Sequence, residues 1–443
     1  MPLRPHRQVG VVHRLRQEDS IVGRSSYNNP SSGREHLSVI GGAIVAPDSP
    51  KAGPWSQPVA RSARKTIRSG PRSMPQYAPC VYKSFSIAGF RGINSLKLAQ
   101  LGKVNLLTGL NDAGKTSVLE ALFLHASGPL AATSALQTLL PGRQQEILAV
   151  GQSVGSPWAT LFPQLSMAAP ILLEAKTQLG AYSLRLEADS SGITQAVLSR
   201  EGARNNRLEE SKSLSIVERR GVGPEKAFRQ SIVAQANGLG TSVQNFSVEF
   251  RLDPATATPY LPAAFIRSQV SYDIVDSFSS DQLNPSGINV LEALRLIDDR
   301  IQDLTVLTSA GRSQLYAKVN GRLLPVQLLG DGVLFIMRAL YAMIAARGGV
   351  LLVDEIGAGV HHSVQTQMWE ILFRAASHLK VQIFATTHSQ EVVTAAKRAI
   401  TTGGGHALAV YRLSRPVEQL ETTVTAYADA VLEAAVEMNA DIR

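Results

Sequence analysis

The sequence predicts an α/β fold with a parallel core sheet, and three observations support this prediction. A short, mostly apolar run, Val104 to Leu107, leads into a glycine-containing loop and then into an apolar helical segment. A second apolar run, Val350 to Val353, ends in two carboxylates. A third, Val381 to Ala385, ends in Thr-Thr-His-Ser. Short apolar runs bounded by polar or glycine residues are typical of strands buried inside a parallel sheet.

The loop after the first of these strands fits the phosphate-binding pattern GxxxxGK[ST], because residues 109–116 read Gly-Leu-Asn-Asp-Ala-Gly-Lys-Thr. The two glycines let the backbone bend, so that its amides form a nest for an anion. The next helix, Ser117 to about His125, would point its positive end at the phosphates. Lys115 is predicted to neutralise the β- and γ-phosphates, and the Thr116 hydroxyl to help hold Mg²⁺. A chance glycine-rich turn is the alternative, and the flanking strand and helix argue against it. The predicted nucleotide-binding residues of this segment are Gly109, Asp112, Ala113, Gly114, Lys115, Thr116 and Ser117.

Asp354 and Glu355 end the second apolar strand. Neighbouring parallel strands end at the same edge of a sheet, so Asp354 is predicted to lie beside Mg²⁺, directly or through water. Glu355 is predicted to orient and polarise the attacking water as general base. Alone, the pair would be explained equally well as a solvated strand end. Lys115 and Asp354 are far apart in the sequence, which predicts a large insertion at about residues 125–305, expected to include a helical region.

Charge and composition divide the chain into two parts. The formal net charge is +9, and most of it lies in residues 1–80, which are rich in Pro, Ser and Gly. These residues are expected to be a disordered basic tail or upstream sequence translated before a true start at Met74, with a nucleic-acid-binding arm and a transit peptide as further alternatives. Residues 81–443 are nearly neutral, so the core itself does not indicate nucleic-acid binding.

The cysteine content and the hydropathy of the chain indicate the cellular compartment in which the protein is expected. The chain has one cysteine, Cys80, which excludes an internal disulfide and fits a reducing cytosol. No uninterrupted apolar run reaches the ~18–20 residues that a membrane span needs. A cytoplasmic location without membrane contact is therefore predicted.

Local patterns predict the remaining elements. Residues 201–230 are polar and glycine-containing and are expected to form an exposed loop or a mobile insertion. Val290 to Leu304 has the spacing of one helix face, and Asn320-Gly321 fits a two-residue hairpin turn. The other expected elements are strands at Tyr82–Ala88, Leu96–Ala99, within 170–198, at Ser247–Leu252, Tyr260–Ile266 and His406–Leu413, and a last helix through Tyr427, Val431, Leu432 and Val436.

The order of these motifs resembles that of the ABC-type ATPase heads, which include the SMC and RecF-like DNA-repair ATPases. Besides the loop and the acidic strand, the chain has a Phe90-Arg91-Gly92 turn, a signature-like Leu328-Leu329-Gly330-Asp331-Gly332 before a helix, a D-loop-like segment at 356–361 and a switch-like His388. It looks closer still to the small bacterial AAA-type ATP/GTP-binding proteins related to the overcoming-lysogenization-defect ATPases. The resemblance covers roughly residues 81–443 and implies a P-loop NTPase with an antiparallel lobe beside the parallel core.

The resemblance also implies further site residues. Arg91 and Asn111 would contact phosphates, and His388 would sense the γ-phosphate. Gly330, Asp331 and Gly332 would cap the γ-phosphate of a nucleotide held by a second subunit. The family usually has Ser where this chain has Gly330, so backbone amides would act there without a hydroxyl. The family's Mg²⁺-sensing glutamine has only positional candidates here, namely Gln137, Gln144 and Gln145.

Together these features predict an ATP-binding, ATP-hydrolysing switch that uses ATP and Mg²⁺ and closes as a homodimer. A separate effector protein and a role in phage defence or DNA-related processes are further expectations. The alternative is a nucleotide-dependent DNA-binding clamp, although the absence of heptads argues against long arms. A nuclease in the same chain is disfavoured by the short segment after His388. ATP and GTP are not distinguished.

Overall fold

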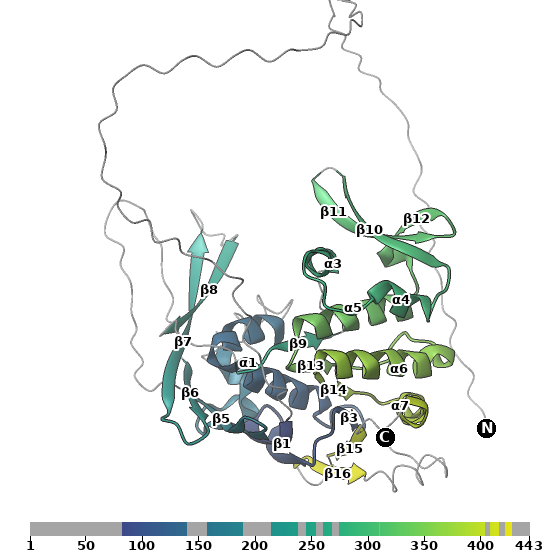
Figure 1. Cartoon of the computed structure of the whole chain (residues 1–443). Coiled ribbons are helices and arrows are strands. Elements are labelled where there is room, and N and C mark those ends of the chain that lie inside the picture. The colour runs from purple at the N-terminus through teal and green to yellow at the C-terminus, as the bar shows by residue number, and fades with distance from the viewer. Residues whose placement is uncertain are drawn as a thin grey trace, which may run out of the picture. The chain divides into compact units, whose positions relative to one another are not determined.

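The computed structural model (Figure 1) describes residues 82–139, 157–188, 214–237, 245–253, 260–267, 274–309, 311–403, 408–415 and 421–427. The chain divides into two units, Met1–Arg72 and Ser73–Arg443, and every described residue belongs to the second. The expectations for residues 1–80 therefore lie outside the described residues.

A six-stranded sheet forms the centre of the second unit, in the order β16-β15-β3-β14-β13-β9. Neighbouring strands within this sheet are parallel, except that β15 and β16 are antiparallel. Every residue of β3, β13 and β14 is buried, as expected for a parallel sheet covered on both faces. The predicted parallel core is confirmed. Its strands are β3 (Val104–Thr108), β9 (Ala263–Ile266), β13 (Val350–Val353), β14 (Gln382–Thr386), β15 (Leu408–Ser414) and β16 (Thr423–Tyr427).

The two faces of this sheet belong to two hydrophobic cores. In β13, Leu351 and Val353 join the core formed with α5 (Asp331–Ala345), α6 (His362–Leu379) and α7 (Gln390–Gly403). Val350 and Leu352 join the other core, which contains α1 (Lys115–Leu139) and the antiparallel lobe. Successive side chains of a strand point to opposite faces, so this alternation places the phosphate-loop helix and α5 on opposite sides of the sheet.

The predicted antiparallel lobe is a seven-stranded sheet in the order β2-β1-β4-β5-β6-β7-β8. The expected helical region is described only where α1 continues to Leu139. The expectation of a loop at 201–230 is wrong for its described part, because β6 and the start of β7 lie there. Leu214, Ile216 and Glu218 are buried while the residues between them are partly exposed, and such a half-polar pattern resembles that of a loop. The strands are β1 (Tyr82–Phe90), β2 (Ile93–Ala99), β4 (Ile171–Thr177), β5 (Gly180–Ala188), β6 (Leu214–Arg220), β7 (Lys226–Asn237) and β8 (Asn245–Asp253), with 3-10 turns η1 (Pro157–Leu161) and η2 (Pro163–Leu165).

A smaller sheet of β10 (Ile301–Ser309), β11 (Arg312–Val319) and β12 (Arg322–Pro325) follows two helices, α3 (Ile274–Leu283) and α4 (Val290–Arg295). The expected helix from Val290 to Leu304 is therefore wrong beyond α4. Ile301 and Leu304 are both buried because an irregularity between Ile301 and Asp303 shifts the register of β10, which imitates helical spacing.

The turn between β11 and β12 agrees with the sequence. Asn320 and Gly321 both have positive φ, 49° and 78°, as a two-residue hairpin turn requires. At the other end of the described chain, Tyr427 ends β16 rather than lying in a helix, and Val431, Leu432 and Val436 lie outside the described residues. None of the described helices has the length and apolar content that a bilayer crossing needs.

His125 of α1 forms hydrogen bonds to the lobe. Its burial predicts that the folded protein is less stable at acidic pH. Its Nδ1 lies 2.8 Å from the Tyr82 hydroxyl and its Nε2 lies 3.2 Å from the Tyr182 carbonyl oxygen. Burial lowers the pKa of His125 to about 3, with the Tyr182 hydrogen bond opposing the shift. Between pH 6.5 and 3 the unfolded chain binds a proton here that the folded chain excludes, so stability falls as the pH falls. We expect a loss of about 3 kcal/mol at pH 4 relative to pH 8.

Urea unfolding between pH 4 and pH 8 measures this effect. His125→Gln is expected to flatten the pH dependence by the stated amount, even where the variant is less stable overall. An unchanged slope in the variant would assign the acid sensitivity to other groups.

Candidate nucleotide site

The phosphate loop connects β3 to α1 in a conformation that needs glycine. Gly109 has φ of +137°, and a Cβ added to it would lie 2.2 Å from the Leu413 carbonyl oxygen of β15. Gly114 has φ of +91°. Asp112 also has positive φ, 63°, which is uncommon for residues other than glycine. The loop therefore has the close approach and the unusual backbone that an anion cradle requires.

The Lys115 ammonium is held within this loop. Its Nζ donates to the carbonyl oxygens of Gly109 at 2.8 Å and Leu110 at 2.9 Å, and the residue is only 8% exposed. Burial lowers the pKa of Lys115, and the charges of Glu355 and Asp354 oppose this shift. The cation of the loop thus lies within electrostatic reach of the acidic strand end.

Thr116 and Asp354 are in direct contact. The Thr116 hydroxyl donates to the two Asp354 carboxylate oxygens at 3.0 and 3.1 Å. The Thr386 hydroxyl donates to the same carboxylate at 2.7 Å and accepts from the Glu355 amide at 2.8 Å. The structure therefore brings together the two stretches that the sequence predicted would converge. Thr386 is a residue that sequence reasoning missed, although its place at the end of a buried strand was visible.

Strand register explains the convergence. The amide of Asp354 donates to Ile266 at 2.9 Å, and the amide of Thr387 donates to Leu107 at 3.0 Å. The ends of β9, β13, β14 and β3 are thereby tied along one edge of the sheet. Ligand sites of open α/β sheets form outside these carboxyl ends.

The two proposed reaction-centre side chains lie at the same edge. His388 Nδ1 is 3.8 Å from Glu355 Oε1, and both side chains are about half exposed. Glu355 has φ of 58°, a left-handed backbone that is uncommon for this residue type. A residue held in such a conformation by its surroundings is typical of functional sites.

Arg91 lies in the turn between β1 and β2, also with positive φ, 51°. Its guanidinium pairs with Glu120 of α1 at 2.9 Å, and Arg267 after β9 contacts the other oxygen of the same carboxylate. Glu120 and Arg267 were not predicted. The signal for Glu120 was a lone carboxylate inside the apolar run of α1, one helical turn after Thr116.

Gly330 is the N-cap of α5, and no side chain caps this helix end. A Cβ at Gly330 would meet nothing within 4 Å, so the family's usual Ser would fit here without displacing a neighbour. Asp331 is exposed and lies against the D-loop-like segment, because a Cβ on Gly359 would be 3.1 Å from the Asp331 Cβ. Gly332 lies beside Val360. The signature-like and D-loop-like segments thus share one surface.

For the other predicted site residues, the structure gives exposure and position in the chain. Asn111 is exposed, Ala113 is buried and Ser117 is partly buried at the start of α1. Gln137 lies in α1 with its side chain outside the description, and Gln144 and Gln145 lie outside the described residues.

The side-chain oxygens of Thr116 and Asp354 suit Mg²⁺, which takes only part of its ligands from the protein. Among the described residues no group of three or more His, Cys, Asp or Glu side chains could hold a metal ion. Mg²⁺ usually keeps several waters and is held by one or two carboxylates together with substrate phosphates. One carboxylate, Asp354, beside the Thr116 hydroxyl and the phosphate loop fits that pattern.

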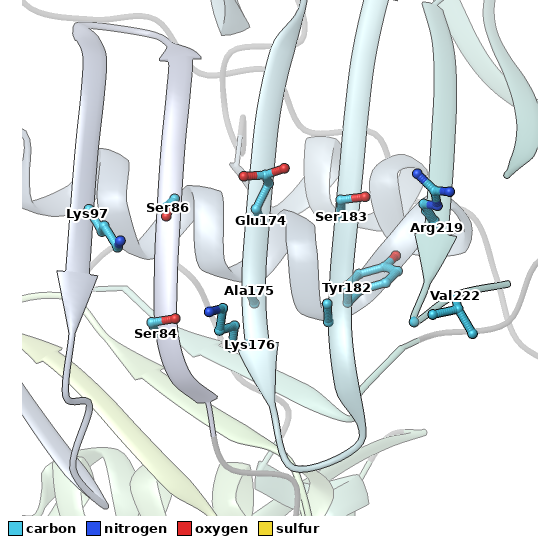
Figure 2. A pocket seen from close by; sticks show the side chains of 12 residues that line it. Ser84, Ser86, Lys97, Glu174, Ala175, Lys176, Tyr182, Ser183, Arg219 and Val222 are labelled. Atoms are coloured by element: carbon cyan, nitrogen blue, oxygen red, sulfur yellow. The ribbon is translucent and has the colours of Figure 1, made fainter. Parts of the chain in front are cut away.

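A separate cavity of about 590 Å³ lies on the antiparallel lobe. Figure 2 shows Lys97, Ser86, Glu174, Ser183 and Arg219 in a row across five strands, as the strand register requires. These residues stand on the sheet face opposite the buried one that packs on α1. None of the predicted nucleotide-site residues lines this cavity, so we place the candidate site at the edge of the core sheet.

Residues 315–394 match the family model described as "AAA domain, putative AbiEii toxin, Type IV TA system". The match confirms the resemblance to AAA-type ATPases over this segment. The segment includes the signature-like turn, the acidic strand and His388. A curated relative, the uncharacterized protein MJECL10 of Methanocaldococcus jannaschii, is 48% identical over 48 residues, which are 11% of this chain and 22% of that protein. The chain thus matches about a fifth of that relative's length.

Three solved SMC heads are similar to the chain at low identity. An SmcHead bound to the C-winged helix domain of ScpA covers 79% of this chain with a TM-score of 0.40 and 11% identity. The SMC head domain of Thermotoga maritima covers 78% with a TM-score of 0.34 and 10% identity. The Pyrococcus furiosus head domain with an extended coiled coil, bound to the C-terminal domain of ScpA, covers 81% with a TM-score of 0.35 and 10% identity. In each case 98% of the other chain is covered.

Proposed function

We propose that the chain binds ATP with Mg²⁺ in the phosphate loop and hydrolyses it, acting as a nucleotide-gated homodimeric switch. The observation that carries the proposal is the contact of Thr116 with Asp354 beside the buried Lys115. It joins a phosphate loop and an acidic strand end, the two parts that P-loop nucleotide hydrolases need.

Each residue has a part in the proposed reaction. Lys115 exchanges its carbonyl contacts for phosphate oxygens. The loop amides, Asn111 and the Arg91 guanidinium, which keeps its pair with Glu120, bind the remaining phosphate charge. Bound Mg²⁺ would neutralise charge on the phosphates, with Thr116 and Asp354 as its protein ligands. Glu355 orients water in line with the γ-phosphate and accepts its proton, and His388 contacts the γ-phosphate.

Exposed leucines support the proposed dimer. Leu110 in the phosphate loop and Leu328 at the start of the signature-like segment are each 71% exposed. If the loop of one subunit meets the signature of the other, both side chains are covered, and the amides of Gly330, Asp331 and Gly332 reach the bound nucleotide.

The family description names a putative toxin of a Type IV TA system, which favours a defence setting as the biological role. A separate effector protein is part of the proposal. A DNA-binding clamp is the alternative. Retention of the protein on duplex DNA that falls steeply with rising salt would favour the clamp.

Turnover and mass of the full chain, measured with and without Mg²⁺-ATP, test the proposed function. Hydrolysis together with an ATP-dependent doubling of mass is the expected result. Tight nucleotide binding without turnover would instead indicate a static sensor, and no binding would contradict the proposal.

A further inference from the structure

Glu120 is a fully buried carboxylate that joins three parts of the fold. It lies one helical turn after Thr116, so both side chains project from the same face of α1. Its two oxygens contact Arg91 of the lobe and Arg267 of the core sheet. The arginine side chains are 24% and 16% exposed, so the cluster is largely shielded from water.

Arg267 directly follows β9, the strand that contacts both the phosphate-loop helix and the signature-like helix. Ala264 of β9 belongs to the hydrophobic core that contains α5, and Phe265 belongs to the one that contains α1. The ring of Phe265 lies 5.6 Å from that of Phe123 in α1, and the Arg267 guanidinium lies 5.0 Å from the Phe265 ring centre. These contacts connect α1 to β9.

The residue before this arginine is hydrogen-bonded to the backbone of the predicted metal ligand. The Asp354 amide donates to the carbonyl oxygen of Ile266, the residue before Arg267. Burial raises the pKa of Glu120 and the two arginines oppose this, while the charge of Asp354 raises it further. The two carboxylates are thus electrostatically coupled. Of these charges, that of Asp354 has the smallest effect on the pKa of Glu120.

We propose that Arg267 is a positioning residue. Through its pair with Glu120, it makes the position of α5 depend on whether a nucleotide is bound in the phosphate loop. This inference rests on the proposed function. The Glu120–Arg267 pair fixes the end of β9 to α1, and β9 packs against α5. Binding at Thr116 and Asp354 is therefore transmitted to the helix whose first residues, Gly330 to Gly332, meet the nucleotide of the other subunit.

Arg267→Met tests the inference. The buried Glu120 carboxylate keeps a cationic partner in this variant, because Arg91 still pairs with it. Methionine also keeps an apolar stem over Phe265. We expect the nucleotide affinity of the monomer to stay within about threefold of wild type, and ATP-dependent dimerisation to weaken by about tenfold or more, as loss of a coupling between two sites requires. A fluorescent ATP analogue measures the affinity, and sedimentation at several protein concentrations measures dimerisation.

Arg91→Met is the matched control, since it removes the same charge from the same carboxylate and leaves Arg267 in place. It is expected to show the opposite pattern, with weaker nucleotide binding and normal dimerisation once the loop is saturated. Arg267→Lys keeps the charge but lacks the planar guanidinium, so partial rescue is expected. Thermal melting of all three variants shows whether each is folded.

Three results would overturn the inference. These are wild-type dimerisation of folded Arg267→Met, equal loss of dimerisation in the two methionine variants, or loss of nucleotide affinity in Arg267→Met as large as the loss of dimerisation. If the wild-type chain neither binds ATP nor dimerises with it, the proposed function fails instead, and the two failures are distinguishable.

Discussion

Replacing Glu355 with Gln is expected to lower ATP turnover by about 100-fold or more and to trap an ATP-bound dimer, because loss of a general base removes a factor of roughly 10²–10⁴. The Glu355 side chain stands half exposed beside His388 at the end of β13. Glutamine keeps its size and can still orient a water, but it cannot accept the proton. Steady-state turnover and solution mass with Mg²⁺-ATP measure the two effects.

Glu391→Gln is a suitable control for this variant. Glu391 is an exposed carboxylate in the first turn of α7, close in sequence to His388 but outside the proposed site. It is expected to hydrolyse ATP at the wild-type rate. If Glu355→Gln did so as well, the general-base assignment would be wrong.

Lys115→Ala is expected to lower nucleotide affinity by about 100-fold or more, because the proposed contact of its buried ammonium with two phosphates has no substitute in the loop. The loop would keep its amides but lose its central charge. Equilibrium titration with a fluorescent ATP analogue measures the loss, and thermal melting shows that the variant is folded.

Lys103→Ala provides the comparison. Lys103 is also partly buried, and burial likewise lowers its pKa, but its ammonium donates to the Ser377 hydroxyl at 3.1 Å. Its removal is expected to leave nucleotide affinity unchanged. Equal losses in the two lysine variants would mean that Lys115 has no special place at the phosphates.

The core sheet and the convergence of its strand ends could be predicted because they depend on short-range patterns. Val350 to Val353 is apolar throughout and ends in Asp354, and the phosphate loop has a specific spacing. Parallel pairing then places such strand ends together whatever lies between them in the sequence. The roles of Asp354, Glu355 and His388 in catalysis stay predictions.

The elements that were missed depend on context that a local pattern lacks. The polar residues of β6 are compatible with a loop until the neighbouring strands are known, because one face of this sheet is solvated. Ile301 and Leu304 imitate a helix because a register shift brings both to one face. The cluster of Glu120 and Arg267 joins residues that are distant in the chain, and no spacing rule connects them.

Magnesium dependence of nucleotide affinity in Asp354→Asn tests most directly whether the loop and the acidic strand hold one metal–nucleotide complex. In the wild-type chain, Mg²⁺ is expected to tighten ATP binding, and Asp354→Asn is expected to lose most of that gain while binding ATP without metal about as before. Asp299→Asn, an exposed carboxylate next to β10, should keep the full gain. An undiminished gain in Asp354→Asn would show that the metal is held elsewhere and would contradict the proposed site.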